Sequence, residues 1–544
     1  MILEFTIIAY RGLFFCAVRG LLYPQRLLTM DMDASSSWFS DLCNKLQRND
    51  PETTQIMDPT TGLRLLSLEE ESSNLLGEAF LGNNIVTDVR LCYHKLEGHG
   101  ANSHHAILDA IRACKNLKYV AFSGPLRSSH LNHSFLGSLA LNKALEFVGL
   151  YEMALGANSL SLLLLGSGRT MSTFHLGFCR LVVTNGIELQ NAVTAFRDHK
   201  YLLSLRLDII YGMFEALEEA IVSHPILREL IIDGALYEGI PFFEGIRAVT
   251  YPHLNMPSVF SVLCSIVESP GSALQHLQLE NFLFNRVGTS FAVLVQSILV
   301  NQTLTKLTFG GWCTFDISPV QPLVSIYQSS SSNIQSLRFR QSVTYTRLLP
   351  LIFEHPIPGL KELEVSGYII VEPSTIRLLT SGAMMSLERC KITQLMEDGC
   401  HTLIQVLPHV RKLKELILGL SGATHHLKED LLNAIEKNSS LVKVMVYTTV
   451  DSNTYPHDDG EEVYFSDNQL TKVGLYTRRN ELLPQMLLGE PYSEFTLSLL
   501  PRLFHIAKPS WMGSCYVFGC LLQLKDVIGP SSEHKSWKGC GTGT

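Results

Sequence analysis

The stretch Leu274-Gln-His-Leu277-Gln-Leu279 decides the fold of this 544-residue chain. Thirty residues later the pattern returns as Leu304-x-x-Leu307-x-Phe309, and thirty after that as Ile334-x-x-Leu337-x-Phe339. Alternating apolar residues are typical of a strand with one buried face, and each interval also holds an apolar run of helical period. The repeat therefore predicts an α/β horseshoe-shaped solenoid, with parallel strands on the concave face and helices on the convex face.

The same six-residue pattern recurs along most of the chain. Its other copies are Leu63-x-x-Leu66-x-Leu68, Val86-x-x-Val89-x-Leu91, Leu117-x-x-Val120-x-Phe122, Leu145-x-x-Val148-x-Leu150, Leu202-x-x-Leu205-x-Leu207, Leu227-x-x-Leu230-x-Ile232, Leu360-x-x-Leu363-x-Val365, Leu413-x-x-Leu416-x-Leu418 and Leu441-x-x-Val444-x-Val446. Degenerate copies at Thr173-x-x-Leu176-x-Phe178 and Leu387-x-x-Cys390-x-Ile392 fill two wider gaps. Between the strands, apolar residues of helical spacing predict helices around 213–221, 291–299 and 427–435.

One interval, from Leu227 to Leu274, is too long for a single repeat. Residues 234–271 must hold either an insertion or a repeat whose strand has decayed. Pro241, Pro252 and Pro257 favour a protruding loop in this interval, because proline cannot donate a backbone hydrogen bond to a helix or a sheet.

The chain divides into five predicted segments. Residues 1–34 form an apolar segment that is disordered or acts in targeting, residues 35–62 an N-terminal cap, and residues 63–450 the repeat array. Residues 451–528 form an acidic loop and a helical C-terminal cap, and residues 529–544 a disordered tail. Arg11, Arg19 and Arg26 interrupt the first segment too often for a bilayer span; a transit peptide and a mis-assigned start both stay open.

Composition narrows the classes of function. A net charge of −8 gives no global basicity, so nucleic acid is not an expected partner, and no integral membrane association is expected. The twelve cysteines lack metal-site spacing, which indicates reduced and mostly buried thiols in a cytoplasmic protein, or an organellar one if the N-terminal segment is a transit peptide. No metal, cofactor or catalytic arrangement can be identified.

Three short motifs have ordinary structural explanations. Gly166-Ser-Gly168-Arg-Thr170 lacks the Lys-Ser/Thr ending of a phosphate loop and is expected to be a turn. His104-His105 and His425-His426 are adjacent residues, which cannot face one metal from a helix. Asn132, Asn301 and Asn438 head glycosylation triplets, but the last two occupy a fixed place three residues before a strand leucine and are expected to be structural.

With these repeats, the chain resembles the ribonuclease-inhibitor-like leucine-rich-repeat family over residues 63–446. Asn301 and Asn438 match that family's asparagine before the first strand leucine. The helix with Tyr476 and Arg478-Arg479-Asn480 resembles the end of uncharacterised leucine-rich-repeat proteins from algae. The family also places Asn or Cys in the turn after each strand, whereas the residues expected there are Phe282, Trp312, Ser342, Tyr368 and Ser421, so less uniform turns are expected.

Polar residues between the strand leucines should face the concavity and form a surface of mixed charge, which suits a protein or peptide. This candidate surface comprises Arg206, Asp208, Arg228, Glu229, Gln275, His276, Gln278, Lys306, Arg338, Arg340, Lys361, Glu364, Lys391 and Lys414. The hypothesis is a non-enzymatic protein-binding scaffold of unspecified oligomeric state. Two alternatives are a substrate-receptor subunit of a ubiquitin ligase, although no F-box-like module precedes the repeats, and a Ran GTPase-activating protein-like regulator, although no acidic C-terminal tract is present.

Overall fold

A computed structural model describes most of the repeat array. The described residues are 37–57, 66–67, 70–92, 105–123, 129–166, 170–177, 179–209, 213–234, 256–282, 288–310, 313, 333–340, 359–366, 376, 386–395, 397–421, 427–449, 462–463 and 465–488. The predictions for residues 1–34, for the acidic loop up to residue 461, for the part of the helical C-terminal cap after residue 488, and for the tail lie outside these residues.

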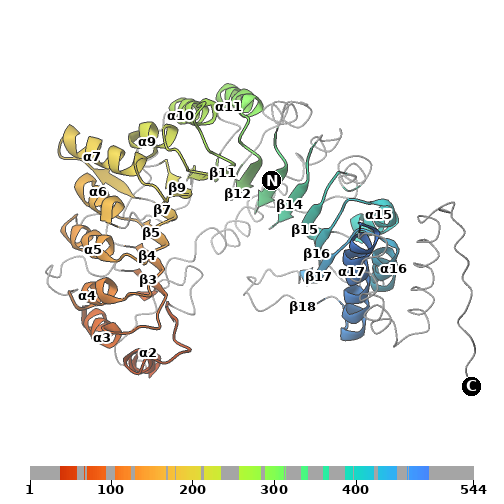
Figure 1. The fold of residues 1–544 in the computed structure, drawn as a ribbon, viewed down its shortest axis with the longest axis horizontal. Coiled ribbons are helices and arrows are strands. Elements are labelled where there is room, and N and C mark those ends of the chain that lie inside the picture. The colour runs from red at the N-terminus through yellow and green to blue at the C-terminus, as the bar shows by residue number, and fades with distance from the viewer. Residues whose placement is uncertain are drawn as a thin grey trace, which may run out of the picture.

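One curved 16-stranded sheet lines the inner side of an arc (Figure 1). Its strands are β1 (Gln55–Ile56), β2 (Leu66–Ser67), β3 (Asp88–Cys92), β4 (Tyr119–Ser123), β5 (Phe147–Tyr151), β7 (Thr173–Gly177), β9 (Ser204–Asp208), β10 (Glu229–Asp233), β11 (His276–Glu280), β12 (Lys306–Gly310), β13 (Ser336–Arg340), β14 (Glu362–Ser366), β15 (Arg389–Leu395), β16 (Glu415–Ser421), β17 (Lys443–Thr449) and β18 (Glu462–Val463). All neighbours pair in parallel except β17 and β18, which pair antiparallel. A second, two-stranded sheet joins β6 (Ala154–Gly156) to β8 (Arg180–Val182).

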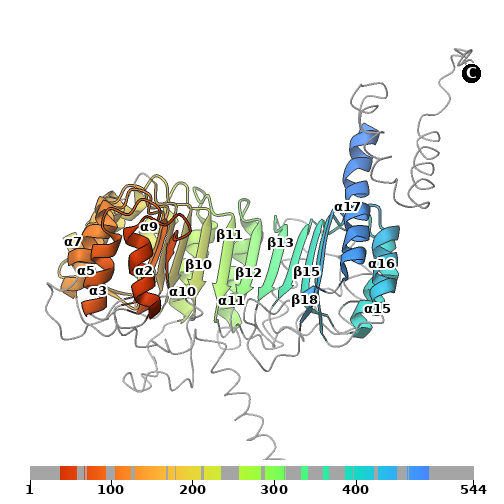
Figure 2. The same ribbon diagram turned by 90° about the horizontal axis from the view of Figure 1, so that it is seen from below.

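Helices cover the outer side of the arc (Figures 1 and 2). They are α2 (Ser37–Gln47), α3 (Glu70–Phe80), α4 (His105–Ala113), α5 (Ser129–Leu141), α6 (Ala157–Gly166), α7 (Gly186–Arg197), α8 (Met213–Ala216), α9 (Glu218–Val222), α10 (Met256–Glu268), α11 (Gly288–Val300), α15 (Glu397–Val406), the 3-10 helix η5 (Leu407–His409), α16 (Lys428–Lys437) and α17 (Asp467–Leu488). The helices predicted at 291–299 and 427–435 are confirmed as α11 and α16. The helix predicted at 213–221 is divided at Leu217 into α8 and α9.

The predicted alignment of the strand leucines is confirmed. Leu277 lies opposite Leu307, which lies opposite Leu337, and all three are fully buried between the sheet and the helices. At the sixth position the rings of Phe309 and Phe339 stack with centroids 5.7 Å apart. Because side chains alternate between faces, these apolar columns fix the register of every strand on its neighbour.

The long interval before Leu274 is an insertion, not a decayed repeat. β10 and β11 are direct hydrogen-bonded neighbours over all five of their residues, so no strand lies between them. The predicted loop residues Pro241 and Pro252 lie outside the described residues. Pro257 does not lie in a loop: it is the second residue of α10, where a helix needs no backbone donor.

Two of the predicted strand registers are wrong. Leu66 was expected at the fourth position of the first copy of the repeat, but it pairs with Leu91 and so takes the sixth position. Ile56 in β1 pairs with Val89 and takes the fourth position instead. The first rung is therefore assembled from two separate segments and begins before residue 63. In β7, Phe174 and Leu176 take the fourth and sixth positions, so the copy starts at Met171 and not at Thr173. A two-residue shift keeps the same side chains inward, which is why alternation alone did not reveal it.

Buried asparagine side chains connect several of the rungs to the rung before them. Asn301 Nδ2 donates to the Val267 carbonyl, and Asn301 Oδ1 accepts from the backbone N–H groups of Thr303 and Leu304. Asn438 makes the same connections to Leu407, Val410, Ser440 and Leu441, which confirms the structural role expected for both asparagines.

Two further asparagines and two histidines occupy the same place in other repeats. Asn83 and Asn142 make equivalent bridges to the preceding repeats. His199 and His224 accept from the N–H groups two residues ahead of them. Burial lowers the pKa of His199. Burial, together with the nearby His199 ring, lowers the pKa of His224 to about 4, so both rings are neutral at pH 7.

Cysteine does occupy the turn after two strands. With the corrected register, Cys179 follows Leu176 by three residues, and its thiol donates to the carbonyls of Leu150 and Gly177. Cys313 donates to the carbonyls of Leu279 and Gly310. The expected departure from the family's turn chemistry is therefore incomplete. The eight cysteines in the described part of the chain are free thiols, seven of them buried.

The predicted closing helix is confirmed as α17, which packs on α16 and β17 at the end of the arc (Figure 2). The Arg479 guanidinium donates to the carbonyls of Glu436 and Asn438, at 2.9 and 2.5 Å. Asn480 Nδ2 donates to the carbonyls of Asn438 and Leu441. These two residues satisfy the backbone acceptors that the next repeat would otherwise have bonded.

We predict that Asn301→Ala lowers the free energy of unfolding by about 2 kcal/mol, because it leaves a buried carbonyl and two buried N–H groups without partners. Equilibrium urea denaturation measures the change. Gln302→Ala, in the same turn but exposed, is the matched control and should be close to neutral. Equal destabilisation by the two variants would contradict the structural role of Asn301.

Candidate functional site

Three side chains of each five-residue strand face the concavity, as His276, Gln278 and Glu280 do in β11. Nine of the residues predicted to bind a partner lie on this face: Arg206, Asp208, His276, Gln278, Lys306, Arg338, Arg340, Glu364 and Lys391. Glu229, also expected to face inward, lies there as well.

Four predicted residues lie at the rim instead. Arg228, Gln275, Lys361 and Lys414 each come one residue before a strand and are exposed. Their backbone groups continue the connection between rungs; the Gln275 carbonyl, for example, accepts from the N–H groups of Thr305 and Lys306. Sequence spacing grouped them with the strand residues because it does not show where the strand begins.

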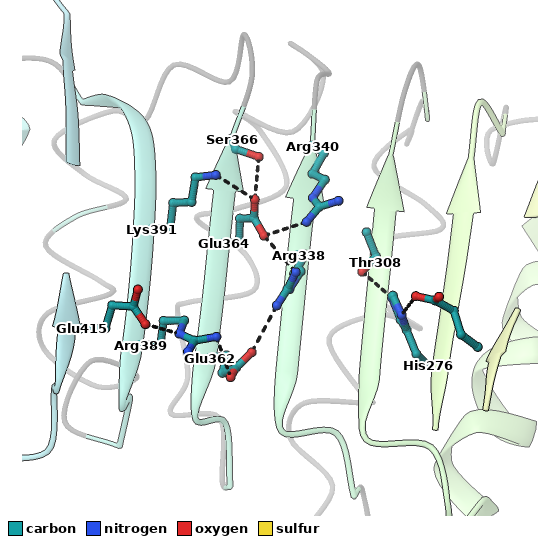
Figure 3. A network of polar contacts seen from close by, with 11 residues as sticks. His276, Thr308, Arg338, Arg340, Glu362, Glu364, Ser366, Arg389, Lys391 and Glu415 are labelled. Carbon is teal, nitrogen blue, oxygen red and sulfur yellow. Dashed lines mark hydrogen bonds and ion pairs between the residues drawn. The ribbon is translucent and has the colours of Figure 1, made fainter. Parts of the chain in front are cut away.

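Glu364 is the centre of a charged network on β13, β14 and β15 (Figure 3). Its carboxylate accepts from Arg340 at 3.1 Å and from Lys391 at 3.2 Å, and Arg338 lies 3.4 Å away. Burial opposes ionisation of Glu364. The hydrogen bond from Arg340 and the surrounding positive charges outweigh that effect, so the pKa of Glu364 lies below its ordinary value.

The same network continues among residues at the N-terminal ends of the strands. Glu362 accepts from Arg338 at 3.4 Å and from Arg389 at 3.3 Å. Arg389 in turn donates to Glu415 at 2.6 Å, and Lys443 donates to the other oxygen of Glu415 at 2.7 Å. Ion pairs thus connect five consecutive strands, β13 to β17, across the concave face.

His276 connects its own strand, β11, to β10 and β12. Its Nδ1 lies 2.5 Å from Glu229, and its Nε2 lies 2.9 Å from the Thr308 hydroxyl. Burial, reinforced by the charge of Lys306, lowers the pKa of His276 despite the carboxylate beside it. The neutral ring therefore donates from Nδ1 to Glu229 and accepts the Thr308 hydroxyl at Nε2. The hydrogen bond from His276 is the main reason that the pKa of Glu229 falls to about 2.

Arg206 is held by two carboxylates from different strands. Its Nη2 lies 3.1 Å from Asp233 and 2.7 Å from Glu280. Asn281 donates to Asp233, and Gln278 donates to Glu280. Burial raises the pKa of Glu280, and the neighbouring Asp233 charge acts in the same direction, whereas the positive charge of Arg206 opposes the rise.

An aromatic cluster on β3, β4, β5 and β7 was missed by the sequence analysis. The rings of Tyr119 and Phe147 stack with centroids 3.8 Å apart, and Phe147 meets the His175 ring edge-on at 4.7 Å. Arg90 lies over the other side of Tyr119, 4.7 Å from its centroid. Tyr119 and Phe147 take the same variable position in consecutive copies of the repeat, a signal that the sequence contained.

Two glycines leave room for the Tyr151 ring beside this aromatic cluster. A Cβ atom on Gly149 would lie 2.9 Å from the Tyr151 ring, and one on Gly177 would lie 2.7 Å from it. Tyr151 lies between them, with its hydroxyl 3.5 Å from His175 Nδ1. Burial raises the pKa of Tyr151 to about 12 and lowers that of His175 to about 4, so both are neutral at pH 7.

The charge on the concave face changes sign along the arc. From β3 to β11 the face carries five carboxylates and two cations, a net of −3: Asp88, Arg90, Arg206, Asp208, Glu229, Asp233 and Glu280. From β12 to β17 it carries six cations and three carboxylates, a net of +3: Lys306, Arg338, Arg340, Glu362, Glu364, Arg389, Lys391, Glu415 and Lys443. We call these the acidic and basic halves.

Among the described residues, no group of three or more His, Cys, Asp or Glu side chains is placed to hold a metal ion. None of the helices in the described ranges is both long and apolar enough to cross a membrane.

The strand register, the buried leucine columns and the outer helices define the class of the protein: it is a leucine-rich-repeat solenoid. No family profile matches the chain, and no curated protein matches it. Solved structures similar to it include the yeast Rad7–Elc1 complex, at 14% identity over 84% of this chain and 93% of that one, with a TM-score of 0.33. The TLR13–ssRNA13 complex is similar at 14% identity, 72% and 62% coverage and a TM-score of 0.32. An internalin from Listeria monocytogenes is similar at 12% identity, 71% and 85% coverage and a TM-score of 0.25.

We predict that Glu364→Gln destabilises the protein by about 2 kcal/mol at pH 7, because three cations lose their shared carboxylate. A carboxyl group whose pKa is lowered in the folded state contributes its full stabilisation of the protein when the pH is above the group's ordinary pKa of 4.5. This contribution disappears as the pH falls through the folded-state pKa. The difference from the wild type should therefore shrink on acidification, measured as urea midpoints at pH 7 and pH 3.

Glu78→Gln is the matched control for this prediction, because Glu78 is exposed on the convex helix α3. It should leave the midpoint unchanged at both pH values. A Glu364→Gln effect that persists undiminished at pH 3 would show that shape, and not charge, gives Glu364 its role.

Proposed function

We propose that this chain is a non-enzymatic scaffold of the ribonuclease-inhibitor-like kind, which binds another protein along its concave face. The observation that carries the proposal is the aromatic cluster. Tyr119 and Phe147 lie on the concave face and are only partly buried, whereas the apolar residues on the opposite face of the same strands are fully covered.

Partly exposed aromatic side chains beside an arginine are the usual anchors of protein interfaces. Here their cost of ordering is already met, because Tyr119 is held between the Phe147 ring and the Arg90 guanidinium. Asp88 fixes Arg90 in turn, at 2.9 Å. A partner would therefore meet a preformed surface and lose little entropy in adapting it.

The polar part of the concave face fits the same function. Most of its charges already have partners within the sheet, so the face is a fixed pattern of alternating sign rather than a uniform field. Such a pattern discriminates between protein surfaces, whereas a polyanion such as nucleic acid would be repelled by the carboxylates of both halves.

The test is to capture partners of the tagged full-length protein from its own cells, identify them by mass spectrometry, and measure the affinity of the best one. Phe147→Ala should weaken binding at least about tenfold, as expected for an anchor residue. Ile187→Ala is the control: Ile187 is 74% exposed on the convex helix α7, and its loss should leave affinity unchanged. Undiminished binding by Phe147→Ala would contradict the proposal.

The identity of the captured protein separates the scaffold from its two alternatives. Cullin-adaptor subunits among the partners would indicate the substrate receptor of a ubiquitin ligase. A small GTPase retained only when loaded with GTP would indicate the Ran GTPase-activating protein-like regulator.

A further inference from the structure

The basic half contains one cation without a partner. Lys306 lies on β12 beside β13, and no described carboxylate lies within ion-pair distance of its ammonium group. Burial lowers the pKa of Lys306, and the charges of Arg338 and Arg340 lower it further, whereas Glu229 and Glu362 act in the opposite direction. These two carboxylates offset the positive charge at this point only in part, because the pKa remains lowered and neither forms an ion pair with Lys306.

Two polar atoms on β13, the strand beside Lys306, also lack hydrogen-bond partners among the described residues. Ser336 pairs with Lys306 across the β12–β13 register; its side chain is 6% exposed, and its Oγ is buried without a partner. Arg340 Nε is likewise buried without an acceptor, although Arg340 Nη2 reaches Glu364. An unsatisfied hydroxyl beside an unpaired ammonium group favours the approach of a carboxylate.

The charges of the basic half alternate from strand to strand. Cations stand on β12 and β13, on β15 and on β17, whereas β14 and β16 carry the carboxylates Glu362, Glu364 and Glu415. Adjacent strands lie about 4.8 Å apart, so β12 lies about 5 Å before β13, and β13, β15 and β17 follow one another at intervals of about 10 Å. An extended chain crossing the strands covers that distance in about three residues.

We propose that the basic half binds an extended acidic segment of the partner protein, with carboxylates about three residues apart. The first carboxylate meets Lys306 and the Ser336 hydroxyl, the next meets Arg389 and Lys391, and the third meets Lys443. The segment spans about 24 Å from β12 to β17, which is about seven residues. This inference rests on the proposed function, and it adds the chemistry of the partner and the direction in which it lies.

The three-residue spacing distinguishes this occupant from a nucleic acid. A phosphate backbone carries its charges without interruption, so some phosphates would lie against Glu362, Glu364 and Glu415. An acidic protein segment can place uncharged residues opposite these carboxylates. The acidic half, with a net charge of −3, directs such a segment toward β12 to β17 rather than toward β3 to β11.

The test uses the full-length protein and a fluorescent nine-residue peptide with Glu at its first, fourth and seventh positions and Gly elsewhere. Fluorescence anisotropy should show binding that weakens as salt rises, and the peptide with Gln in place of Glu should bind at least about fivefold more weakly. Lys306→Gln should weaken binding of the acidic peptide by a similar factor. Lys306 makes no ion pair, so this change leaves the network around Glu364 in place.

Lys437→Gln, on the convex helix α16, is the matched control and should bind as the wild type does. Equal binding of the Glu and Gln peptides, or undiminished binding by Lys306→Gln, would overturn the inference. Tighter binding of an oligouridine of the same length would also overturn it, in favour of nucleic acid. If the peptide fails while the captured partner still depends on Phe147, only this inference falls and the proposed scaffold function stands.

Discussion

The register between neighbouring parallel strands is the constraint on which the structure depends. Each strand can bury its leucines only if they lie opposite the leucines of the strands on both sides, as Leu277 does between Leu230 and Leu307. A shift by one residue would turn every apolar side chain toward solvent. Once register is fixed, every side chain on the concave face has fixed neighbours as well, so the buried leucine columns and the polar pattern of the concave face are set by the same hydrogen bonds.

This constraint explains why the concave charges are mutually paired. Residues at equivalent positions of adjacent strands lie close together, so opposite charges on neighbouring rungs form ion pairs and like charges repel. Arg338 and Glu364 are such a pair, as are Lys391 and Glu364. Carboxylates on β14 and cations on β13 and β15 thus stabilise the sheet, while they also form the surface that a partner would meet. In the proposed function, the side chains that stabilise the sheet are also the ones that recognise the partner.

The solenoid itself could be predicted from the sequence, because its signal is repeated. Copies with clear leucines, such as the one at Leu304, had their register confirmed; copies at Leu63 and Thr173 did not. In the first of these the rung is formed by two segments far apart in sequence, which no single six-residue pattern can represent. In the second, two alignments bury equally apolar residues, and only the neighbouring strands decide between them.

The candidate site was predictable only in part. Alternation correctly placed residues such as Arg338 and Lys391 on the concave face, but it could not show that Glu364 holds both of them. It also placed Lys361 on the concave face, although Lys361 lies at the rim because the strand begins one residue later. The aromatic cluster was not predicted, because the stacking of Tyr119 on Phe147 depends on the register across strands rather than on either strand alone.

The two ends of the sheet have a consequence for how the protein behaves in a crowded solution. The first rung consists of β1 and β2, which have two residues each, and the last strand, β18, has two residues and runs against the direction of the others. A continuous, flat edge would invite a second molecule to add its own strand and so begin a fibre. With such short and reversed borders, neither edge of the sheet in the described part of the chain offers a template that another copy could extend, and a long stack of parallel strands can exist as separate molecules.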